Sequence, residues 1–201
     1  MSEAFMSGAF MSEAIMSDLL AGFGDPVRDS QSVFRAVMDA MARPGRVHRV
    51  IGPLVPPLDP ATAAVLLTLV DGETPLWLDD DVAAAWEWIA FHCGARRAPA
   101  AAAAFAVVKG PTALTRFPAG SDEAPETSAT IILQVEALGA GDALRLSGPG
   151  LAGEETLRVT GLPASFIDFW QGNRRSFPRG VDVILCAGDR LAALPRTVEI
   201  G

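Results

Sequence analysis

Short strand-like runs alternate with helix-like runs along most of this chain, and this alternation limits the fold more than any single motif does. Apolar runs at 74–78, 105–108 and 130–135 are typical of buried strands. An almost unbroken apolar run at 61–70 and a segment with an acidic start at 79–91 predict helices between them. The pattern continues with strands at 143–147, 156–159, 181–186 and 191–194 and a helix at 163–170, and the last two strands predict a hairpin turning at Gly188-Asp189. Such interleaving predicts an α/β protein in which helices cover a mixed sheet.

The segment from Asp29 to Gly45 carries the strongest helix signal. Asp29 and Ser30 offer side-chain oxygens to the first free backbone N–H groups, and Pro44-Gly45 is a helix stop. Between them, Phe34, Val37, Met38 and Met41 recur at helical spacing and predict a single apolar stripe. Positive charge gathers beside the bend, on Arg35, Arg43 and Arg46. The pattern therefore predicts an amphipathic helix with a basic end.

Charge and composition exclude several classes of function. The 201-residue chain has a formal net charge of −8, which disfavours a general nucleic-acid binder because phosphate backbones attract positive surfaces. No apolar run reaches about eighteen residues, so no membrane association is expected. Cys93 and Cys186 stand far apart, which predicts reduced core thiols and a cytoplasmic protein. Lys109 is the only lysine, and its place in a turn after a strand predicts exposure rather than a catalytic role.

The first twenty residues form a five-residue repeat in which each unit begins with Met-Ser. A period of five suits neither a helix nor a strand, and the segment lacks the cationic start of a targeting signal. We therefore expect residues 1–22 to be a flexible leader and residues 23–201 to be a single α/β domain. The alternative is a short helix that docks on a partner through Phe5, Phe10, Ile15 and Leu19.

Familiar catalytic and metal motifs occur only in weak form. Residues 148–153 match G-x-G-x-x-G, but a strand rather than a helix is predicted to follow, which favours a glycine-rich hairpin over a dinucleotide site. His92-Cys93 favours a structural role, because zinc needs three or four converging ligands. Asp79, Asp80 and Asp81 favour a solvated helix cap over a cation site, so no metal centre is expected.

Nine polar residues stand at junctions between the predicted elements, where functional loops usually lie. They are Arg43, Arg46, Asp71, Thr74, His92, Glu126, Arg179, Asp182 and Arg196. Each has a structural explanation as a cap, a turn or an ion-pair partner. As a set they offer arginine forks for a carboxylate or a phosphorylated small molecule, but they contain no nucleophile–base pair. The residues therefore favour a binding or assembly surface over a self-sufficient active site.

Several short sequence strings at these junctions follow one another in an order that is characteristic of a known family. They are Asp25-Pro26-Val27, Phe34-Arg35, Pro44-Gly45, 62–69, 74–78, Phe91-His92, Pro125-Glu126, 129–135, 144–150, Phe177-Pro178, Gly180-Val181-Asp182 and 190–197. In this order they resemble PhnH, a subunit family of the bacterial carbon–phosphorus lyase system. The match runs from about residue 23 to the C-terminus and leaves the leader outside.

The resemblance implies a three-layer α/β/α fold with a mixed sheet, related to the pyridoxal-phosphate-dependent transferases but without that cofactor. It implies work in a complex with the sister subunits PhnG, PhnI, PhnJ and PhnK, with PhnL involved in the first step, and a homodimer when isolated. In that step the ribose triphosphate of ATP is joined to a phosphonate as adenine leaves, before the C–P bond is cleaved. It assigns no catalytic residue to this subunit.

Two other classes of function stay open at this point. One is an independent enzyme that uses pyridoxal phosphate or a dinucleotide, through Lys109 or residues 148–153. The other is a purely structural adaptor whose junction residues bind no ligand.

Overall fold

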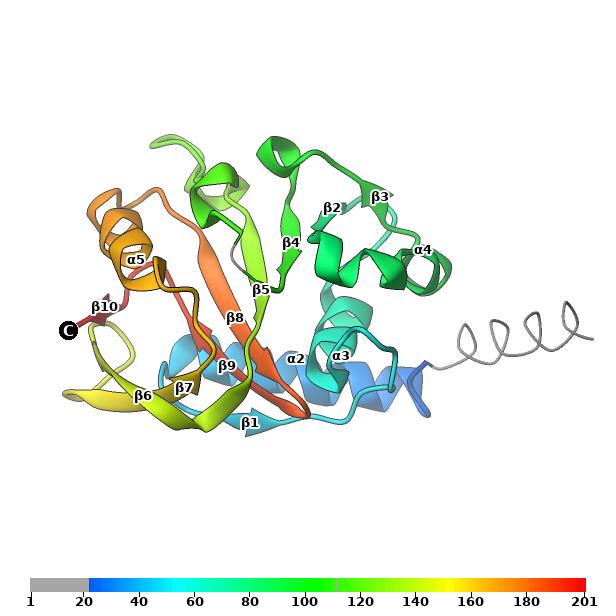
Figure 1. Ribbon diagram of the computed structural model, residues 1–201, viewed down its shortest axis with the longest axis horizontal. Coiled ribbons are helices and arrows are strands. Elements are labelled where there is room, and N and C mark those ends of the chain that lie inside the picture. Colours follow the sequence, from blue (N-terminus) through cyan, green and yellow to red (C-terminus); the bar gives the residue numbers. More distant parts are fainter. Residues whose placement is uncertain (1–21, 111) are drawn as a thin grey trace, which may run out of the picture.

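A seven-stranded mixed sheet forms the centre of the protein in the computed structural model, which describes residues 22–110 and 112–201 (Figure 1). The strands are β1 (His48–Arg49), β2 (Pro75–Leu78), β3 (Arg96–Arg97), β4 (Phe105–Val108), β5 (Thr130–Gln134), β8 (Asp182–Ala187) and β9 (Arg190–Leu194). Their order across the sheet is β1-β9-β8-β5-β4-β2-β3. The strands from β3 to β8 run parallel, whereas β9 and β1 are antiparallel to their neighbours. The predicted α/β protein with a mixed sheet is confirmed.

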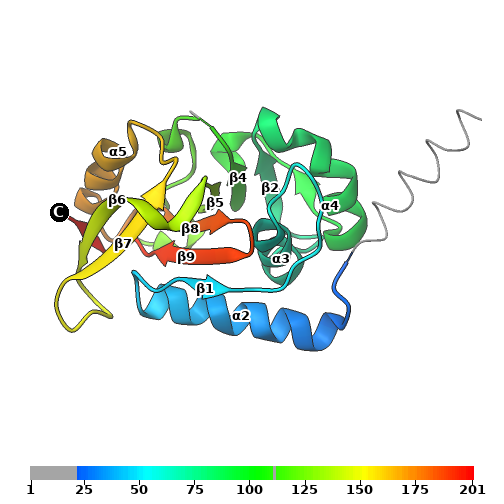
Figure 2. The ribbon, with the colours of Figure 1, turned by 60° about the horizontal axis from the view of Figure 1, so that its bottom comes forward.

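Helices cover one face of this sheet. They are α2 (Pro26–Ala42), α3 (Pro60–Leu69) and α4 (Trp86–Cys93), the last preceded by the 3-10 turn η1 (Asp80–Ala85) (Figures 1 and 2). The six residues 61–66 of α3 are all buried, because this helix packs against α2, α4 and β8. A helix enclosed on several sides needs no polar face, which explains its nearly all-apolar sequence.

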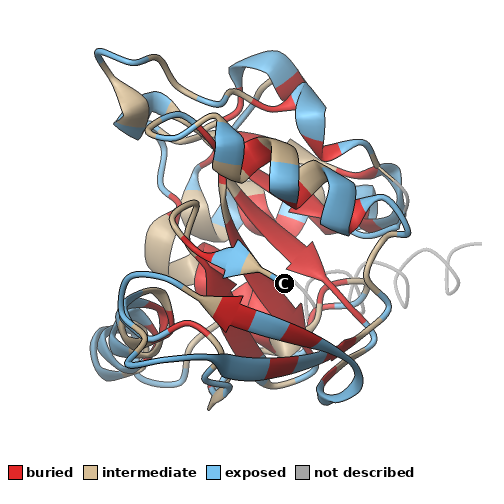
Figure 3. Cartoon of the chain, turned by 90° about the vertical axis from the view of Figure 1, so that its left-hand side faces the viewer, coloured by how far each residue is buried: buried red, intermediate tan, exposed pale blue. Residues whose placement is uncertain are grey.

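The opposite face is covered by α5 (Phe166–Arg175) and by a second, three-stranded sheet. That sheet contains β6 (Ala137–Ser147), β7 (Glu155–Thr160) and β10 (Glu199–Ile200) in the order β10-β6-β7. Figure 3 shows β6 and β7 alternating between buried and exposed residues over part of their length. Successive residues of the central strands face opposite layers, so Ile184 of β8 belongs to the core under α3 and Leu185 to the core under α5.

The start of α2 differs from the prediction that Asp29 and Ser30 cap it. The cap is Asp25, whose Oδ1 accepts from the backbone N–H of Arg28 at 3.1 Å. Asp29 lies inside the helix and accepts from the backbone N–H of Asp25 at 2.9 Å. The reason is Pro26, whose fixed φ and missing N–H suit the first helical position and move the start forward.

The predicted apolar stripe of α2 faces the core only in part: Val37 is buried and Met41 packs against the core, but Phe34 and Met38 do not. The residues that face the core are Val33, Val37 and Ala40, whereas Phe34 and Met38 are 49% and 53% exposed. Small and β-branched side chains let the helix approach α3 and β9 closely, which the bulkier Phe34 and Met38 would prevent. The predicted helix exists and ends at Ala42, before Pro44-Gly45.

Among the other elements, the boundaries of α5 and β6 depart most from prediction. The segment 105–108 is a strand as predicted, and β8 and β9 form the predicted hairpin, although β10 follows it. Helix α5 begins at Phe166 and continues to Arg175, later at both ends than the predicted 163–170. Strand β6 begins at Ala137, before the predicted 143, because its glycines at 139 and 141 hid the strand pattern.

The remaining described segments are connections. Three further 3-10 turns lie there: η2 (Ala100–Ala102), η3 (Leu114–Arg116) and η4 (Pro125–Thr127). None of the helices in the described part of the chain combines the length and apolarity needed to cross a membrane. The predicted repeat leader, apart from its last residue, falls outside the described residues.

Candidate functional site

The structure distributes the nine predicted site residues over several places rather than one. Glu126, Asp182 and Arg196 come together at one edge of the central sheet. Arg43 and Arg46 lie at the end of α2, and Asp71 and Thr74 share a turn. His92 lies on α4, while Arg179 forms its own ion pair.

At the end of α2, both predicted arginines surround a carboxylate that the sequence prediction missed. Arg43 pairs with Asp39, the Nη1 of Arg46 lies 3.9 Å from Asp39 Oδ2, and the Nε2 of His48 lies 3.2 Å from the same oxygen. The i,i+4 spacing of Asp39 and Arg43 was the available signal. We call Asp39, Arg43, Arg46 and His48 the α2 cluster.

The charges of the α2 cluster set the protonation of its histidine. Burial is the main cause that lowers the pKa of His48 below its usual 6.5, and the guanidinium groups of Arg46 and Arg43 add to it. Although Asp39 is close, the Nε2 of His48 forms no hydrogen bond of good geometry with it. Neutral His48 therefore prevails near neutral pH, and Asp39 balances one of the two arginine charges.

The glycine-rich loop lies against the end of α2, which directly precedes Arg43 of the α2 cluster in the sequence. Gly148 and Gly150 connect β6 to β7 with φ angles of +124° and +87°. A Cβ atom on Gly150 would collide with the backbone oxygen of Ala42 at the end of α2. The glycines thus permit close packing against a helix C-terminus, and the strand that follows confirms the predicted hairpin rather than a dinucleotide fingerprint.

The cluster of Glu126, Asp182 and Arg196 lies where β5 and β8 begin, and we call it the amino-edge cluster. Asp182 Oδ2 accepts from Nη2 of Arg196 at 2.6 Å, and Nη1 of Arg196 donates to the carbonyl oxygen of Pro125 at 2.7 Å. The backbone N–H of Arg196 donates to Asp182 Oδ1 at 2.7 Å. A cavity of about 390 Å³ opens beside it, lined also by Glu126. Arg196 is therefore held mainly by internal partners, in a fork that ties three segments together.

Arg179 does not join the amino-edge cluster. Its Nε lies 3.2 Å from Asp122 Oδ1 in an exposed ion pair. Such pairs contribute about 0–1 kcal/mol to stability, so its contact holds a surface loop only weakly.

Asp71 and Thr74 close the turn before β2. The hydroxyl of Thr74 donates to Asp71 Oδ1 at 2.7 Å, and the backbone N–H of Glu73 donates to the same oxygen at 3.0 Å. The Thr74 hydrogen bond is the largest cause that lowers the pKa of Asp71. These contacts fit a turn motif whose polar groups satisfy one another.

His92 and the two cysteines occupy packed surroundings. The His92 ring lies 4.9 Å from that of Trp88 and 5.0 Å from that of Phe91, between ring centroids. Burial raises the pKa of Cys93 to about 11 and that of Cys186 to about 12. Across the described residues, no group of three or more His, Cys, Asp and Glu side chains is placed to hold a metal ion.

A larger cavity, of about 510 Å³, lies at the opposite edge, where β4, β5 and β8 end. Asp59, Asp81, Lys109 and Glu136 line it, and we call it the carboxyl-edge cavity. The rule that open α/β sheets bind ligands beyond the carboxyl ends of their strands would have found it, once the strand order was known. Lys109 is exposed here, as predicted.

Buried Asp79 lies just below that cavity and organises the loops around it. Its Oδ2 accepts from the hydroxyl of Thr112 at 2.7 Å and from the backbone N–H of Lys109 at 3.3 Å. Its Oδ1 accepts from the backbone N–H of Asp80 at 3.0 Å, which is the cap of η1. The predicted cap at Asp79 is therefore confirmed, although this carboxylate is buried rather than solvated.

Fold and site together define a mixed α/β protein whose charged junction residues are largely tied into internal pairs, turns and caps. The chain belongs to the PhnH family: the model of this family, described as bacterial phosphonate metabolism protein, matches residues 21–201. This confirms the resemblance seen in the order of the junction strings.

Two curated relatives give the family context. The chain is 40% identical over 186 residues to alpha-D-ribose 1-methylphosphonate 5-triphosphate synthase subunit PhnH of Rhizobium meliloti, a match covering 89% of this chain and 93% of that protein. It is 37% identical over 171 residues to HtxG of Stutzerimonas stutzeri, a protein assigned as a C-P lyase subunit, with 85% of each chain covered.

Proposed function

We propose that this protein is a non-autonomous subunit of a carbon–phosphorus lyase complex that breaks down organic phosphonates. The observation that carries the proposal is its 40% identity, across 89% of the chain, to a subunit of alpha-D-ribose 1-methylphosphonate 5-triphosphate synthase. Together with its sister subunits it serves the transfer of the ribose triphosphate of ATP to a phosphonate, in which adenine is released before the C–P bond is cleaved.

The distribution of the polar residues supports dependence on other subunits. The α2 cluster, the turn at Asp71 and the amino-edge cluster lie on different elements, and most of their charged groups already have internal partners. A chemical step needs its polar groups within hydrogen-bond reach of one substrate, which groups dispersed in this way do not offer. Residues of a sister subunit would complete such a site.

The proposal extends to partners and location. The sister subunits are PhnG, PhnI, PhnJ and PhnK, with PhnL in the first step, and the isolated protein is a cytoplasmic homodimer. Exposed large apolar side chains on several elements support surfaces that other chains cover. They include Phe34, Met38, Phe91 and Phe177.

For the fold, we propose a three-layer arrangement related to the pyridoxal-phosphate-dependent transferases, with no cofactor of its own, in a single domain over 23–201. The mostly parallel sheet between two covering layers supports this, although one layer combines α5 with the small sheet. Lys109 is exposed after β4, whereas a lysine that forms a Schiff base is usually desolvated.

The test is reconstitution from purified subunits. The chain alone should release no adenine from ATP and methylphosphonate, and the sister subunits with this chain should release it, as measured by chromatography. The matched control is the set of sister subunits without this chain, which should be inactive. Adenine release by the chain alone, or full activity without it, would contradict the proposal.

A single variant separates this role from that of a purely structural adaptor. Arg43→Ala lies at the surface, so the reconstituted complex should keep its size on gel filtration. If turnover is then lost while assembly is intact, the adaptor alternative is wrong. For the independent-enzyme alternative, the decisive observation would be a cofactor absorbance band that Lys109→Ala abolishes.

A further inference from the structure

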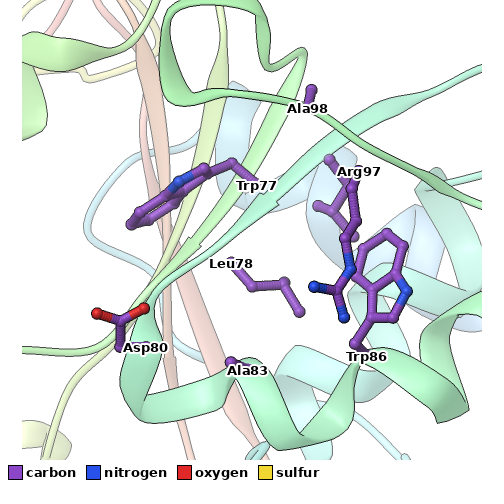
Figure 4. Close-up of a pocket in the computed structure, with 8 residues that line it drawn as sticks. Trp77, Leu78, Asp80, Ala83, Trp86, Arg97 and Ala98 are labelled. Carbon is purple, nitrogen blue, oxygen red and sulfur yellow. The ribbon is translucent and has the colours of Figure 1, made fainter.

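A small cavity lies at the free end of the central sheet, between β2 and the turn η1 (Figure 4). Its volume is about 230 Å³, and its walls include Trp77, Leu78, Ala83, Trp86 and Arg97. None of the nine predicted site residues lines it. It combines aromatic walls with one arginine, a composition typical of binding sites.

Arg97 is the group in this cavity that most needs a partner. Its guanidinium carbon lies 4.5 Å from the centroid of the Trp86 ring, so the planar group rests on the indole. Figure 4 shows the guanidinium beside that ring, directed into the cavity. Within residues 22–110 and 112–201, Arg97 makes no hydrogen bond or ion pair, in contrast to Arg43 and Arg196.

This arrangement suits recognition of an anion. Stacking on Trp86 fixes the plane of the guanidinium and leaves its N–H donors available at the edge. A carboxylate, phosphate or phosphonate can accept two parallel hydrogen bonds from such a fork. Because Arg97 is already oriented, binding an anion would cost little additional conformational entropy.

The rest of the lining suits a small apolar body. Leu78 and Ala83 lie near the Arg97 guanidinium and the Trp86 ring (Figure 4). Trp77 also lines the cavity, but its ring projects from the opposite face of β2, where Phe117 lies edge-on to it at 5.2 Å and Arg116 covers it at 4.9 Å, both measured to ring centroids. A ligand held by Arg97 would therefore meet a preformed apolar surface of Leu78, Ala83 and Trp86.

We propose that this cavity binds a small anion with a flat apolar body, such as an aromatic phosphonate, phosphate or carboxylate. Arg97 holds the anionic group, and the walls formed by Leu78, Ala83 and Trp86 hold the body. The volume is below the range of about 300–1,000 Å³ typical of drug-sized ligands, which limits the body to about one ring system. Asp80 at the rim disfavours a second anionic group, because like charges repel. This site needs no sister subunit, so its test is independent of the reconstitution test.

Phenylphosphonate is the probe, and the indole N–H signals of the four tryptophans in an NMR titration are the measurement. The signal of Trp86, which stacks on Arg97, should shift and saturate. The signals of Trp88 and Trp170, which are buried outside the cavity, should stay in place and report that the fold is intact. Shifts of all four signals alike, or no saturable shift at all, would overturn the proposal.

Two further probes divide the ligand into its parts. Methylphosphonate has the anion without a flat body, and benzyl alcohol has the body without the anion. Each should bind at least about tenfold more weakly than phenylphosphonate, since each loses one of the two contacts. Equal binding of methylphosphonate would show attraction by charge alone and contradict the proposed site.

Arg97→Gln tests the residue itself. The variant should bind phenylphosphonate at least about tenfold more weakly, because a charge-assisted hydrogen bond is lost. Arg35→Gln is the matched control, since Arg35 is an exposed arginine on α2 outside the cavity and should leave affinity unchanged. Unchanged affinity in Arg97→Gln, or an equal loss in Arg35→Gln, would show that Arg97 is not the anion site.

Discussion

At the scale of single residues, His48 links the charge of the α2 cluster to the stability of the fold. Its pKa is lowered, mainly by burial and then by Arg46 and Arg43. Below 6.5 the unfolded chain therefore binds a proton at this histidine more readily than the folded protein does. Stability from neutral His48 is present above 6.5 and is lost as the pH falls through the lower folded-state pKa.

His48→Gln should therefore reduce the loss of stability on acidification. The measurement is the urea unfolding midpoint at about pH 7.5 and about pH 5, on either side of the ordinary histidine pKa. The difference between the two midpoints should be smaller in the variant than in the parent protein. Arg35→Gln is the control, because Arg35 is not one of the charges that lower the pKa of His48. It should retain the parent difference. An unchanged difference in His48→Gln would assign the acid sensitivity to other groups.

The same scale shows which site contacts the sequence can reveal. Asp39 and Arg43 are one helical turn apart, and Asp182 and Arg196 flank the predicted hairpin of β8 and β9, so both pairs were within reach of sequence reasoning. The contact of Arg196 with the carbonyl oxygen of Pro125 was not, because it depends on how a distant loop folds back.

At the scale of elements, α2 shows the limit of reading an apolar stripe. Its existence and its end followed from local chemistry, namely periodic apolar residues and Pro44-Gly45. The rotation of the helix about its axis depends on how closely it approaches α3 and β9. Apolar residues cover a broad part of its circumference, so the helical periodicity alone does not tell which of them face the core. Packing geometry therefore kept Val37 in the core and placed Val33 and Ala40 there instead of Phe34 and Met38.

The loop between β6 and β7 offers a matched pair of glycine substitutions. Gly150→Ala should lower the free energy of unfolding by about 1–3 kcal/mol, because the residue has a positive φ and its new Cβ would meet Ala42. Gly153→Ala should change it by less than about 0.5 kcal/mol, since no atom lies within 4 Å of its Cβ position. Chemical denaturation of the two variants is the measurement. Equal effects would mean that the loop does not pack against α2 as described.

At the scale of the whole molecule, alternation of helices and strands was enough to predict the class of fold, because each short apolar strand needs helices to cover it. The second sheet was predicted only in part: the β6–β7 hairpin was expected, but β10 and the separation from the central sheet were not. Strand β10 is only two residues long and pairs with β6, which is distant in the sequence. Pairing of that kind is set by the assembled surface of the first sheet rather than by any local sequence signal.

The central strand β8 contributes side chains to both hydrophobic cores, so the two layers should unfold together. Ile184→Ala and Leu185→Ala remove fully buried side chains on opposite faces of β8, and each should cost about 2–5 kcal/mol. Both variants should melt in one transition, by circular dichroism and by tryptophan fluorescence alike. Two separate transitions in either variant would contradict a single domain over residues 23–201.

Lys109, exposed at the carboxyl-edge cavity, also gives the protein a native site for covalent labelling. As the only lysine in the sequence, it is the only side chain that an amine-reactive dye would modify, once the α-amine of the chain is blocked. A fluorophore placed there, without any engineered residue, would report on what approaches the edge where the parallel strands end. A label attached to this single lysine before assembly would then mark one known position in fluorescence measurements on the assembled complex.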